Sequence, residues 1–211
     1  ITGNDNPGEN VDPDEEPGNQ MAGWDVRWAS PFGAGPWAVY WHEIGEDESG
    51  RRPIFRLKQA GVEVWGGAES GGAWRAHAEW ADTNPACAEG SSGCAYRGGP
   101  YDVEGYSYFE RSLGHPMFYN SEMISAGLHV TTAVGDRYSG LVRWADINQR
   151  ESGRFHTVAS DNVELWNLEL GYETDRQIGT IRAGVGVDHG ERADGTSYLA
   201  GRGFIELRRQ F

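Results

Sequence analysis

A strictly alternating stretch of this sequence, AWRAHAEWA, carries residues suited to chemistry. Arg75, His77 and Glu79 occupy every second position, and Asp82 follows just beyond them. Because successive side chains of a β-strand point to opposite faces, the first three project from one face. A histidine beside a carboxylate can act as an acid and base pair, whereas an arginine among polar groups binds hydroxyls and carboxylates. The stretch therefore allows either a catalytic pair or a binding surface.

A second polar and aromatic set lies in the segment 82–121, which lacks sustained alternation and which we interpret as one long loop. In this loop His115 stands near Glu110 and Ser112, so an arrangement of serine and histidine is conceivable. The sequence contains no GxSxG or HExxH motif and no cluster with metal-ligand spacing. Binding is therefore favoured over catalysis, and we expect neither a cofactor nor a metal.

The loop is also rich in side chains that bind sugars. Aromatic rings offer flat faces to the C–H groups of a sugar, and arginine offers planar donors to hydroxyl and carboxylate groups. For Arg111 and His115 a structural role is equally compatible, since both could hydrogen-bond the loop against the neighbouring strands. The candidate polysaccharide-binding residues are Arg75, His77, Glu79, Asp82, Tyr108, Arg111 and His115.

Alternating apolar and polar residues predict about nine strands that position these groups. Each strand has an apolar face and a polar or charged face, as in WDVRW at residues 24–28. A change of phase across Gly61 suggests a bulge in the third strand. The strands are expected to start near residues 23, 37, 54, 73, 124, 138, 166, 181 and 196.

The charged face of these strands points to a wet interior. A soluble core does not take a charged triplet such as Arg75, His77 and Glu79 unless the inside is filled with water. The tail 196–211 has apolar residues at alternate positions and ends on Phe211, which is typical of the closing strand of an outer-membrane β-barrel. The fold class predicted is therefore an all-β, antiparallel transmembrane outer-membrane β-barrel.

The expected connections alternate between short and long, as they do in outer-membrane barrels with periplasmic turns and extracellular loops. Residues 1–20 form an acidic extracellular loop in this interpretation, and 21–211 form the barrel. The short turns are 31–36, 66–72, 134–137 and 173–176, and the long polar loops are 1–20, 45–53, 82–121, 146–161 and 189–195.

An odd number of strands does not close an ordinary single-chain bacterial barrel. The chain also begins at Ile1, without a methionine or a signal peptide, inside what we expect to be an extracellular loop. We therefore expect the chain to be the C-terminal half of a larger barrel. The other half would be a missing N-terminal segment or a partner chain.

Composition narrows the function further. The formal net charge of −14 and the absence of a basic tract argue against nucleic acid as a partner. No apolar stretch approaches the roughly twenty residues of a membrane-spanning helix. Cys87 and Cys94 are close together in a Gly/Ser-rich stretch, which favours a short-loop disulfide over two free thiols. A calcium site among the carboxylates of residues 1–20 is conceivable, but a solvated acidic loop fits their spacing better.

Several motifs, in order, resemble those of the Wzi-type capsule-assembly family of outer-membrane proteins. They are PGNQMAGWDVRW (17–28), WHEIGEDE (41–48), EWADT (79–83), CAEGSSGCAY (87–96), GYSYFERSLGH (105–115) and NSEM (120–123). The resemblance implies a barrel of about eighteen strands with a small helical plug near the N-terminus. It also implies a surface lectin that tethers capsular polysaccharide. Nine strands would be half of such a barrel, in agreement with the strand count.

The inward positions of the expected strands carry more basic than acidic residues. This excess predicts an interior suited to an acidic surface polysaccharide, although inward arginines and glutamates that merely pair across the lumen are an equal alternative. We therefore expect a barrel in the outer membrane, surrounded by lipid, that binds capsular or exopolysaccharide at the cell surface. The alternatives are a passive or gated pore and, less favoured, an outer-membrane hydrolase. The inward bases are Arg27, Arg56, Lys58, Arg75, Arg143, Arg182, Arg202 and Arg208.

Overall fold

Nine long antiparallel strands form one sheet, which confirms the predicted fold class. A computed structural model describes residues 21–30, 35–49, 52–69, 71–84, 107–108, 111–112, 114–149, 156 and 158–209, and at residues 21, 46–49, 52–55, 107–108 and 111–112 it describes the backbone alone. The strands are β1 (Met21–Ala29), β2 (Trp37–Ser49), β3 (Arg52–Gly67), β4 (Ala73–Asp82), β7 (Glu122–Thr131), β8 (Arg137–Ile147), β9 (Val163–Arg176), β10 (Gly179–Arg192) and β11 (Ser197–Arg208). Two short strands, β5 (Ser107–Tyr108) and β6 (Arg111–Ser112), pair with each other inside the long loop.

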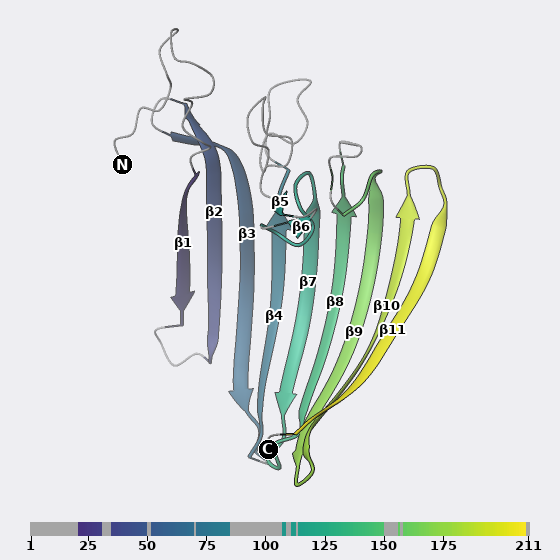
Figure 1. Ribbon diagram of the computed structural model, residues 1–211. Helices are drawn as coiled ribbons and strands as arrows, with labels where there is room; N and C mark the ends of the chain where they lie inside the picture. Colours follow the sequence, from purple (N-terminus) through teal and green to yellow (C-terminus); the bar gives the residue numbers. More distant parts are fainter. Residues whose placement is uncertain are drawn as a thin grey trace.

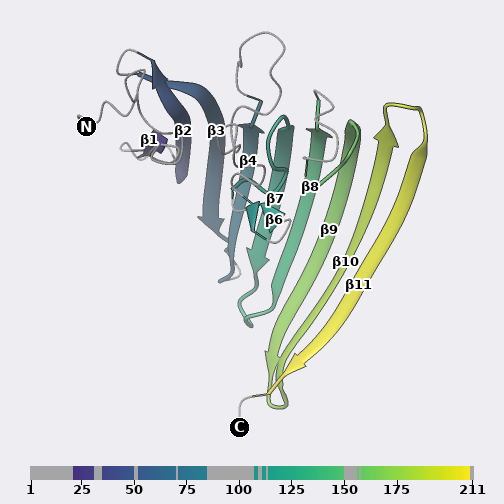
Figure 2. The same cartoon turned by 45° about the horizontal axis from the view of Figure 1, so that its top comes forward.

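Each long strand pairs with its neighbour in the chain, in the order β1-β2-β3-β4-β7-β8-β9-β10-β11. Figures 1 and 2 show these strands side by side in one curved sheet, with β9, β10 and β11 sweeping along its far edge. In the described part of the chain, β1 and β11 each pair on one side only, so the sheet is open. A nine-stranded open wall agrees with the expectation of part of a larger barrel.

The connections sort by length only in part: the long connections after β4 and β8 agree with the predicted loops, but the predicted loop at 189–195 is wrong, because β10 continues to Arg192 and β11 begins at Ser197. The turns after β3, β7 and β9 lie at one end of the sheet, and the loops after β4 and β8 lie at the other (Figure 1). The predicted loop at 45–53 is a difference, because β2 continues to Ser49 and β3 begins at Arg52. Backbone pairing continues there beyond the point where the apolar alternation stops, so the hydrophobic pattern ends before the strand does.

The predicted bulge at Gly61 is wrong. Gly61 pairs in continuous register with Tyr40 of β2 and Glu79 of β4. The register shifts of this pair of strands lie instead at Gly45/Glu46 and Glu46/Glu48. The sequence suggests a change of phase because the outward face of β3 is polar near the start of the strand, at Arg56 and Lys58, and apolar further along, at Val62.

As a consequence, two of the predicted inward bases face outward. Arg56 and Lys58 share the face of Val62, because they are separated by even numbers of residues in an unbroken strand. Arg56 Nη1 donates to Glu43 Oε1 at 3.0 Å on that outward face. Leu57 faces the opposite way and packs against Phe118.

The sheet is inside out compared with that of a soluble protein. In β7 the buried positions are Met123, Ser125 and Gly127, whereas Ile124 is 50% exposed and Leu128 is 46% exposed. The polar face is therefore the concave, enclosed one, and the apolar face is the convex, exposed one. Exposed apolar surface of this extent needs an apolar surrounding, which for a sheet of this kind is lipid.

Aromatic residues lie in two rows on the convex face. The cross-strand register aligns the upper girdle of Trp41, Trp80, Trp144 and Trp166 and the lower girdle of Trp74, Tyr138 and Tyr172. Trp80 and Trp74 are six residues apart on β4, roughly 20 Å at about 3.3 Å per residue. That spacing approaches the apolar band of outer-membrane barrels, which aromatic girdles border at both interfaces. The upper girdle is tied to the loop end by indole donors, since Trp80 Nε1 donates to Glu122 at 2.7 Å and Trp144 Nε1 to Glu164 at 2.9 Å.

The described part of the chain contains no helix that is long and apolar enough to span a membrane.

The largest fully buried side chains of the described residues lie at the loop end, where the residues before β7 pack against the sheet. Phe118 is 2% exposed, Tyr119 is 1% exposed, and they pack with Leu57 of β3. Phe118 and Asn120 have positive φ angles of 64° and 52°, a left-handed backbone that turns the chain sharply. We call Phe118, Tyr119, Asn120, Asn148 and His156 the cap.

The two faces of β7 predict opposite responses to a charge. We expect Leu128→Arg, between the girdles on the convex face, to lower the free energy of unfolding by about 2–4 kcal/mol, because it places a cation in lipid. His129→Arg, one residue along on the concave face, serves as the matched control and should change stability far less. Denaturant titration of protein refolded into lipid vesicles measures both, and equal costs at the two positions would contradict the assignment of faces.

Candidate functional site

The concave face of β1 to β4 is organised around a buried carboxylate. Glu63 of β3 is 3% exposed and lies between Arg27 of β1, two strands away, and Arg75 of the adjacent β4. Arg27 Nε donates to Glu63 Oε1 at 2.7 Å. The Arg75 side chain remains 62% exposed, so its guanidinium keeps donors that face the interior. This arrangement fixes the arginine and leaves it available to a ligand.

The other two candidates on β4 have separate partners. Glu79 accepts a hydrogen bond from the Tyr40 hydroxyl at 2.6 Å. His77 lies beside His129 of β7, with ring centroids 6.1 Å apart and planes 15° from parallel. The structure therefore places Arg75, His77 and Glu79 on one face, as predicted, but it joins Glu79 to a tyrosine and not to the histidine.

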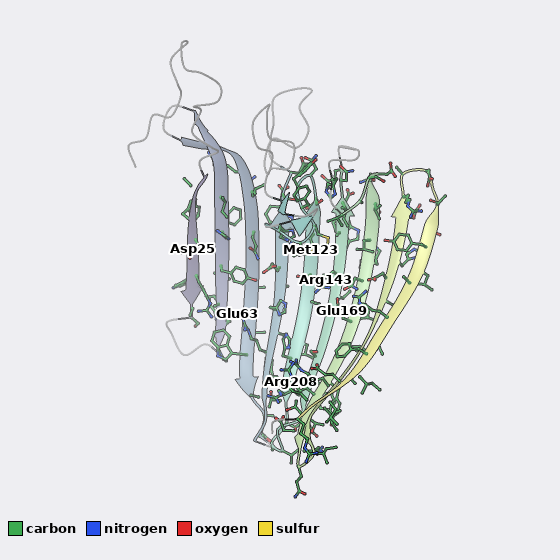
Figure 3. All side chains as sticks on the ribbon, in the orientation of Figure 1. Asp25, Glu63, Met123, Arg143, Glu169 and Arg208 are labelled. Atoms are coloured by element: carbon green, nitrogen blue, oxygen red, sulfur yellow. The ribbon has the colours of Figure 1, made fainter. Side chains whose placement is uncertain are left out.

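A charged network continues along β8 to β11. Arg143 Nη1 donates to Glu169 Oε1 at 2.6 Å and to Asn167 Oδ1 at 2.8 Å. Arg202 Nη2 donates to the same Glu169 oxygen at 2.8 Å and also pairs with Asp188. Glu63, Arg143 and Glu169 are labelled about midway along their strands in Figure 3.

The expected excess of positive charge in the interior is wrong for the described wall. Two of the residues that it relied on, Arg56 and Lys58, face outward. The remaining predicted inward arginines each pair with an inward carboxylate: Arg27 and Arg75 with Glu63, Arg143 and Arg202 with Glu169, Arg182 with Glu173, and Arg208 with Glu206. Charges on the same face of the sheet neutralise each other, which a count of basic residues does not show.

His156 joins the two long loops at the cap. Its Nε2 lies 2.8 Å from the carbonyl oxygen of Tyr119, and its Nδ1 accepts from the backbone N–H of Val158 at 3.3 Å and of Ala159 at 3.2 Å. Since Nδ1 is an acceptor, Nε2 carries the proton and the ring is neutral. Burial holds the pKa of His156 below its ordinary value, and the carbonyl of Tyr119 opposes that effect in part.

The same cap contains Asn148, which ties the β8–β9 connection together. Its side-chain amide donates to the carbonyl oxygens of Ala159 at 3.1 Å and Ser160 at 3.2 Å. Its backbone N–H donates to Ser121 Oγ at 3.3 Å. Together with His156, this residue fixes the last part of one loop against the last part of the other.

His115 lies beside the cap and near the candidate residues of β4. Its Nδ1 accepts from the Met117 backbone N–H at 3.3 Å. Burial lowers the pKa of His115, and the nearby carboxylate of Glu79 acts in the opposite direction. The structure therefore brings one predicted loop residue, His115, close to one predicted strand residue, Glu79.

The remaining candidates are placed differently. Asp82 lies on the convex face, in register with Lys58 and Glu122, and its Oδ1 accepts from the Asn84 backbone N–H at 2.8 Å. It is therefore separated from the concave group. Tyr108 and Arg111 pair through their backbones in the β5–β6 hairpin, while their side chains lie outside the described residues.

Two further predictions concern segments outside the described residues. These are the disulfide of Cys87 and Cys94 and the acidic loop at residues 1–20. Both stay predictions. Among the described residues no group of three or more histidine, cysteine, aspartate or glutamate side chains could hold a metal ion.

Sequence reasoning missed Tyr40, Glu63 and His156. Glu63 and Tyr40 stand at polar positions of alternating strands, so their inward orientation was available from the pattern. Their burial and pairing were not, because these depend on the register between strands. His156 lies in a segment without periodicity, and no sequence signal distinguishes it.

Comparison with known proteins gives one family. The family model described as Capsule assembly protein Wzi matches residues 1–189. A curated protein of Klebsiella pneumoniae, described as an uncharacterized 55.8 kDa protein in the cps region, is 41% identical over 64 residues, which are 30% of this chain and 12% of that protein.

A solved structure has the same fold. It is described as Wzi, an outer-membrane protein involved in group 1 capsule assembly in Escherichia coli and a carbohydrate-binding β-barrel. The match has a TM-score of 0.72 at 22% identity and covers 91% of this chain and 43% of that one. The chain thus spans less than half the length of the relatives it matches.

The neutral state of His156 predicts that acid loosens the cap. The folded state keeps the pKa of this ring below its ordinary value of about 6.5. As the pH falls, His156 is therefore protonated in the unfolded cap at a higher pH than in the folded cap. The stabilisation is complete above about pH 6.5 and is lost as the pH falls below that value. Hydrogen exchange of residues 114–121, corrected for intrinsic rates, should accelerate between pH 7.5 and 5.

His156→Asn should reduce that pH dependence to the part that comes from His115, whose pKa burial also lowers, while raising exchange at neutral pH, because the shorter side chain does not reach the carbonyl of Tyr119. His189→Asn, on the exposed side of β10, is the control and should behave as the wild type. An unchanged pH profile in His156→Asn would disprove the role of this ring.

Proposed function

The chain belongs to the Wzi capsule assembly family, and on that premise we propose that it is part of an outer-membrane β-barrel that binds surface polysaccharide. The barrel would take part in attaching or assembling that polysaccharide at the cell surface. The supporting observation is the inverted wall, with apolar side chains outward and hydrogen-bonding groups on the concave face. A hydrophilic polymer at the cell surface could therefore contact the loop end and the concave face of such a wall.

The strand part of the proposed site is Arg75, His77 and Glu79. Arg75 is anchored by Glu63 yet remains mostly exposed, which suits a planar donor to sugar hydroxyls or carboxylates. His77 and Glu79 add a ring and an acceptor on the same face. Side chains that are held by their neighbours lose little conformational entropy on binding, which favours affinity.

The loop part of the proposed site is Tyr108, Arg111 and His115. His115 supports this assignment because its ring lies within the electrostatic reach of Glu79 and beside the buried cap. Phe118 and Tyr119 anchor the chain directly after His115. A loop fixed at this point can present its aromatic residues over the end of the barrel. Asp82 lies on the convex face at the loop end of β4, so we propose that it contacts polysaccharide only at the outer edge of the site.

We propose binding and not catalysis. An acid and base pair of His77 and Glu79 would need the carboxylate to orient the imidazole. Glu79 instead accepts from Tyr40, and His77 lies against His129. The concave charges are engaged with one another, as expected of a surface that recognises without reacting.

We also propose that further strands complete the barrel, from the same or another chain. The free edges of β1 and β11 support this, because an unpaired strand edge cannot lie in lipid. The convex face of β11 supports it as well, since Ile205 is 85% exposed beside that edge. Lipid is then the partner of the convex face.

Arg75→Gln tests the strand part of the site. Glu63 keeps Arg27 as its partner, so we expect the protein to fold. Loss of a charged hydrogen bond costs about 1.5–3 kcal/mol, which corresponds to roughly tenfold or greater weakening of polysaccharide binding. Binding of purified capsular polysaccharide to detergent-solubilised protein measures the effect. Trp74→Phe, on the convex face of the same strand, is the control, and similar affinities for the two variants would contradict the assignment.

The acidic character of the polysaccharide is a separate proposal, and it depends on exposed cations such as Arg75. If it is correct, binding should weaken between low salt and about 0.5 M salt, because screening shortens the range of charge interactions to a few ångströms. Neutral and acidic polysaccharides compared at two salt concentrations provide the measurement. Equal binding of both, without salt dependence, would exclude a preference for acid while leaving carbohydrate binding intact.

A further inference from the structure

The concave face also carries a hollow of about 410 Å³, in the part of the wall formed by β4 and β7 to β11. Sites for small molecules typically occupy about 300–1,000 Å³. Its lining extends from the histidines of β4 and β7 across the sheet to β11. The side chains used below are His129, Ser139, Leu141, Glu169, Arg202 and Phe204.

Inward glycines create this hollow. Gly171, Gly184 and Gly186 lie at concave positions of the adjacent strands β9 and β10, so side chains of neighbouring strands fold down over them. Phe204 is the largest of these side chains. A Cβ atom added to Gly184 would lie 3.0 Å from Cζ of Phe204 and still closer to Cε1. The ring therefore lies over Gly184, and only glycine leaves room for it there.

The ring of Phe204 faces the interior. It lies on the polar side of the sheet, above Gly184 and among the side chains that line the hollow. Aromatic faces of this kind stack against the C–H face of a sugar ring.

The polar groups around Phe204 match the edge of a sugar. Ser139 and Glu169 can accept hydrogen bonds, while Arg202 and one ring nitrogen of His129 can donate, all beside an apolar floor that contains Leu141. A pyranose has the same division between an apolar face and a polar rim. An acyl chain would leave these polar groups facing hydrocarbon, at a cost.

The charges around the hollow are balanced. Arg202 pairs with Glu169 and Asp188, and Arg143 pairs with Glu169. A charged sugar would have to break one of these pairs or remain without a counter-charge. The balance therefore favours an uncharged ring.

We propose that this hollow is a subsite for one neutral pyranose residue of the polysaccharide, with Phe204 as its stacking surface, an assignment that rests on the proposed function. It lies on the wall between the girdles and is separate from the loops at the barrel end. A polymer bound there would pass one of its sugars into the interior of the barrel. The neutral sugar and any acidic sugar of the same polysaccharide would then bind at different positions on the protein.

Variants of the membrane-extracted, full-length protein test the subsite. Phe204→Leu keeps an apolar side chain and removes the ring, and we expect about tenfold weaker binding of purified capsular polysaccharide. Phe204→Tyr keeps the ring and should bind within twofold of the wild type. Ile205→Leu, the next residue on the convex face, is the control and should bind as the wild type does.

A second measurement reports on the site itself. Protein with 4-fluorophenylalanine at position 204 is titrated with galactose, glucose, mannose and glucuronate and followed by ¹⁹F NMR. The fluorine signal should shift with at least one neutral hexose at a lower concentration than with glucuronate.

The outcomes separate the two proposals. If the wild type binds the polysaccharide while Phe204→Leu binds it equally well and the fluorine signal stays in place, the subsite is disproved and the proposed function stands. If the wild type binds no polysaccharide, both are disproved.

Discussion

The pairing of inward charges across neighbouring strands is the interaction on which the rest of this wall depends. The convex face is apolar because lipid surrounds it, so the concave face must hold the polar groups of every strand. Glu63, 3% exposed, tolerates burial because Arg27 and Arg75 lie on either side of it. Removing a partner from a buried ion pair costs about 3–5 kcal/mol, since an uncompensated charge remains. The same pairing recurs at Glu169, which explains how a strongly charged surface can be stable inside a barrel.

This pairing also shapes what the surface can bind. A ligand gains little from an arginine whose donors are all used, so the available donors are those that pairing leaves over. Arg75 is such a case, with most of its side chain exposed while Glu63 fixes its position. Around Phe204, by contrast, the charges are balanced and the group that faces the interior is an apolar ring. If both proposals hold, the two regions would bind different parts of one polymer.

Alternation alone predicts the strands, because lipid on one side imposes a period of two on each strand. Prediction from alternation fails where the strands extend beyond the lipid. Beyond the upper girdle the polar ends of β2 and β3 carry no pattern, so Arg56 and Lys58 were placed on the wrong face and a bulge was expected at Gly61. Pairing between strands is also invisible to alternation, which is why the interior looked basic. Phe204 stood at an inward position of a well-predicted strand, but the significance of its ring depends on Gly184, which lies opposite it only in the folded sheet.

The glycines beneath Phe204 have an effect on the shape of the barrel as well. Gly140 and Gly203 on the convex side lie close to Gly171 and Gly184 on the concave side, so at this point little more than backbone separates lipid from lumen. A sheet bends most easily where its side chains are smallest. The sweep of β9, β10 and β11 along the far edge in Figure 2 passes through this region. A larger side chain at Gly184 would therefore displace the ring, so the form of the inner surface at this point depends on the absence of side chains beneath it.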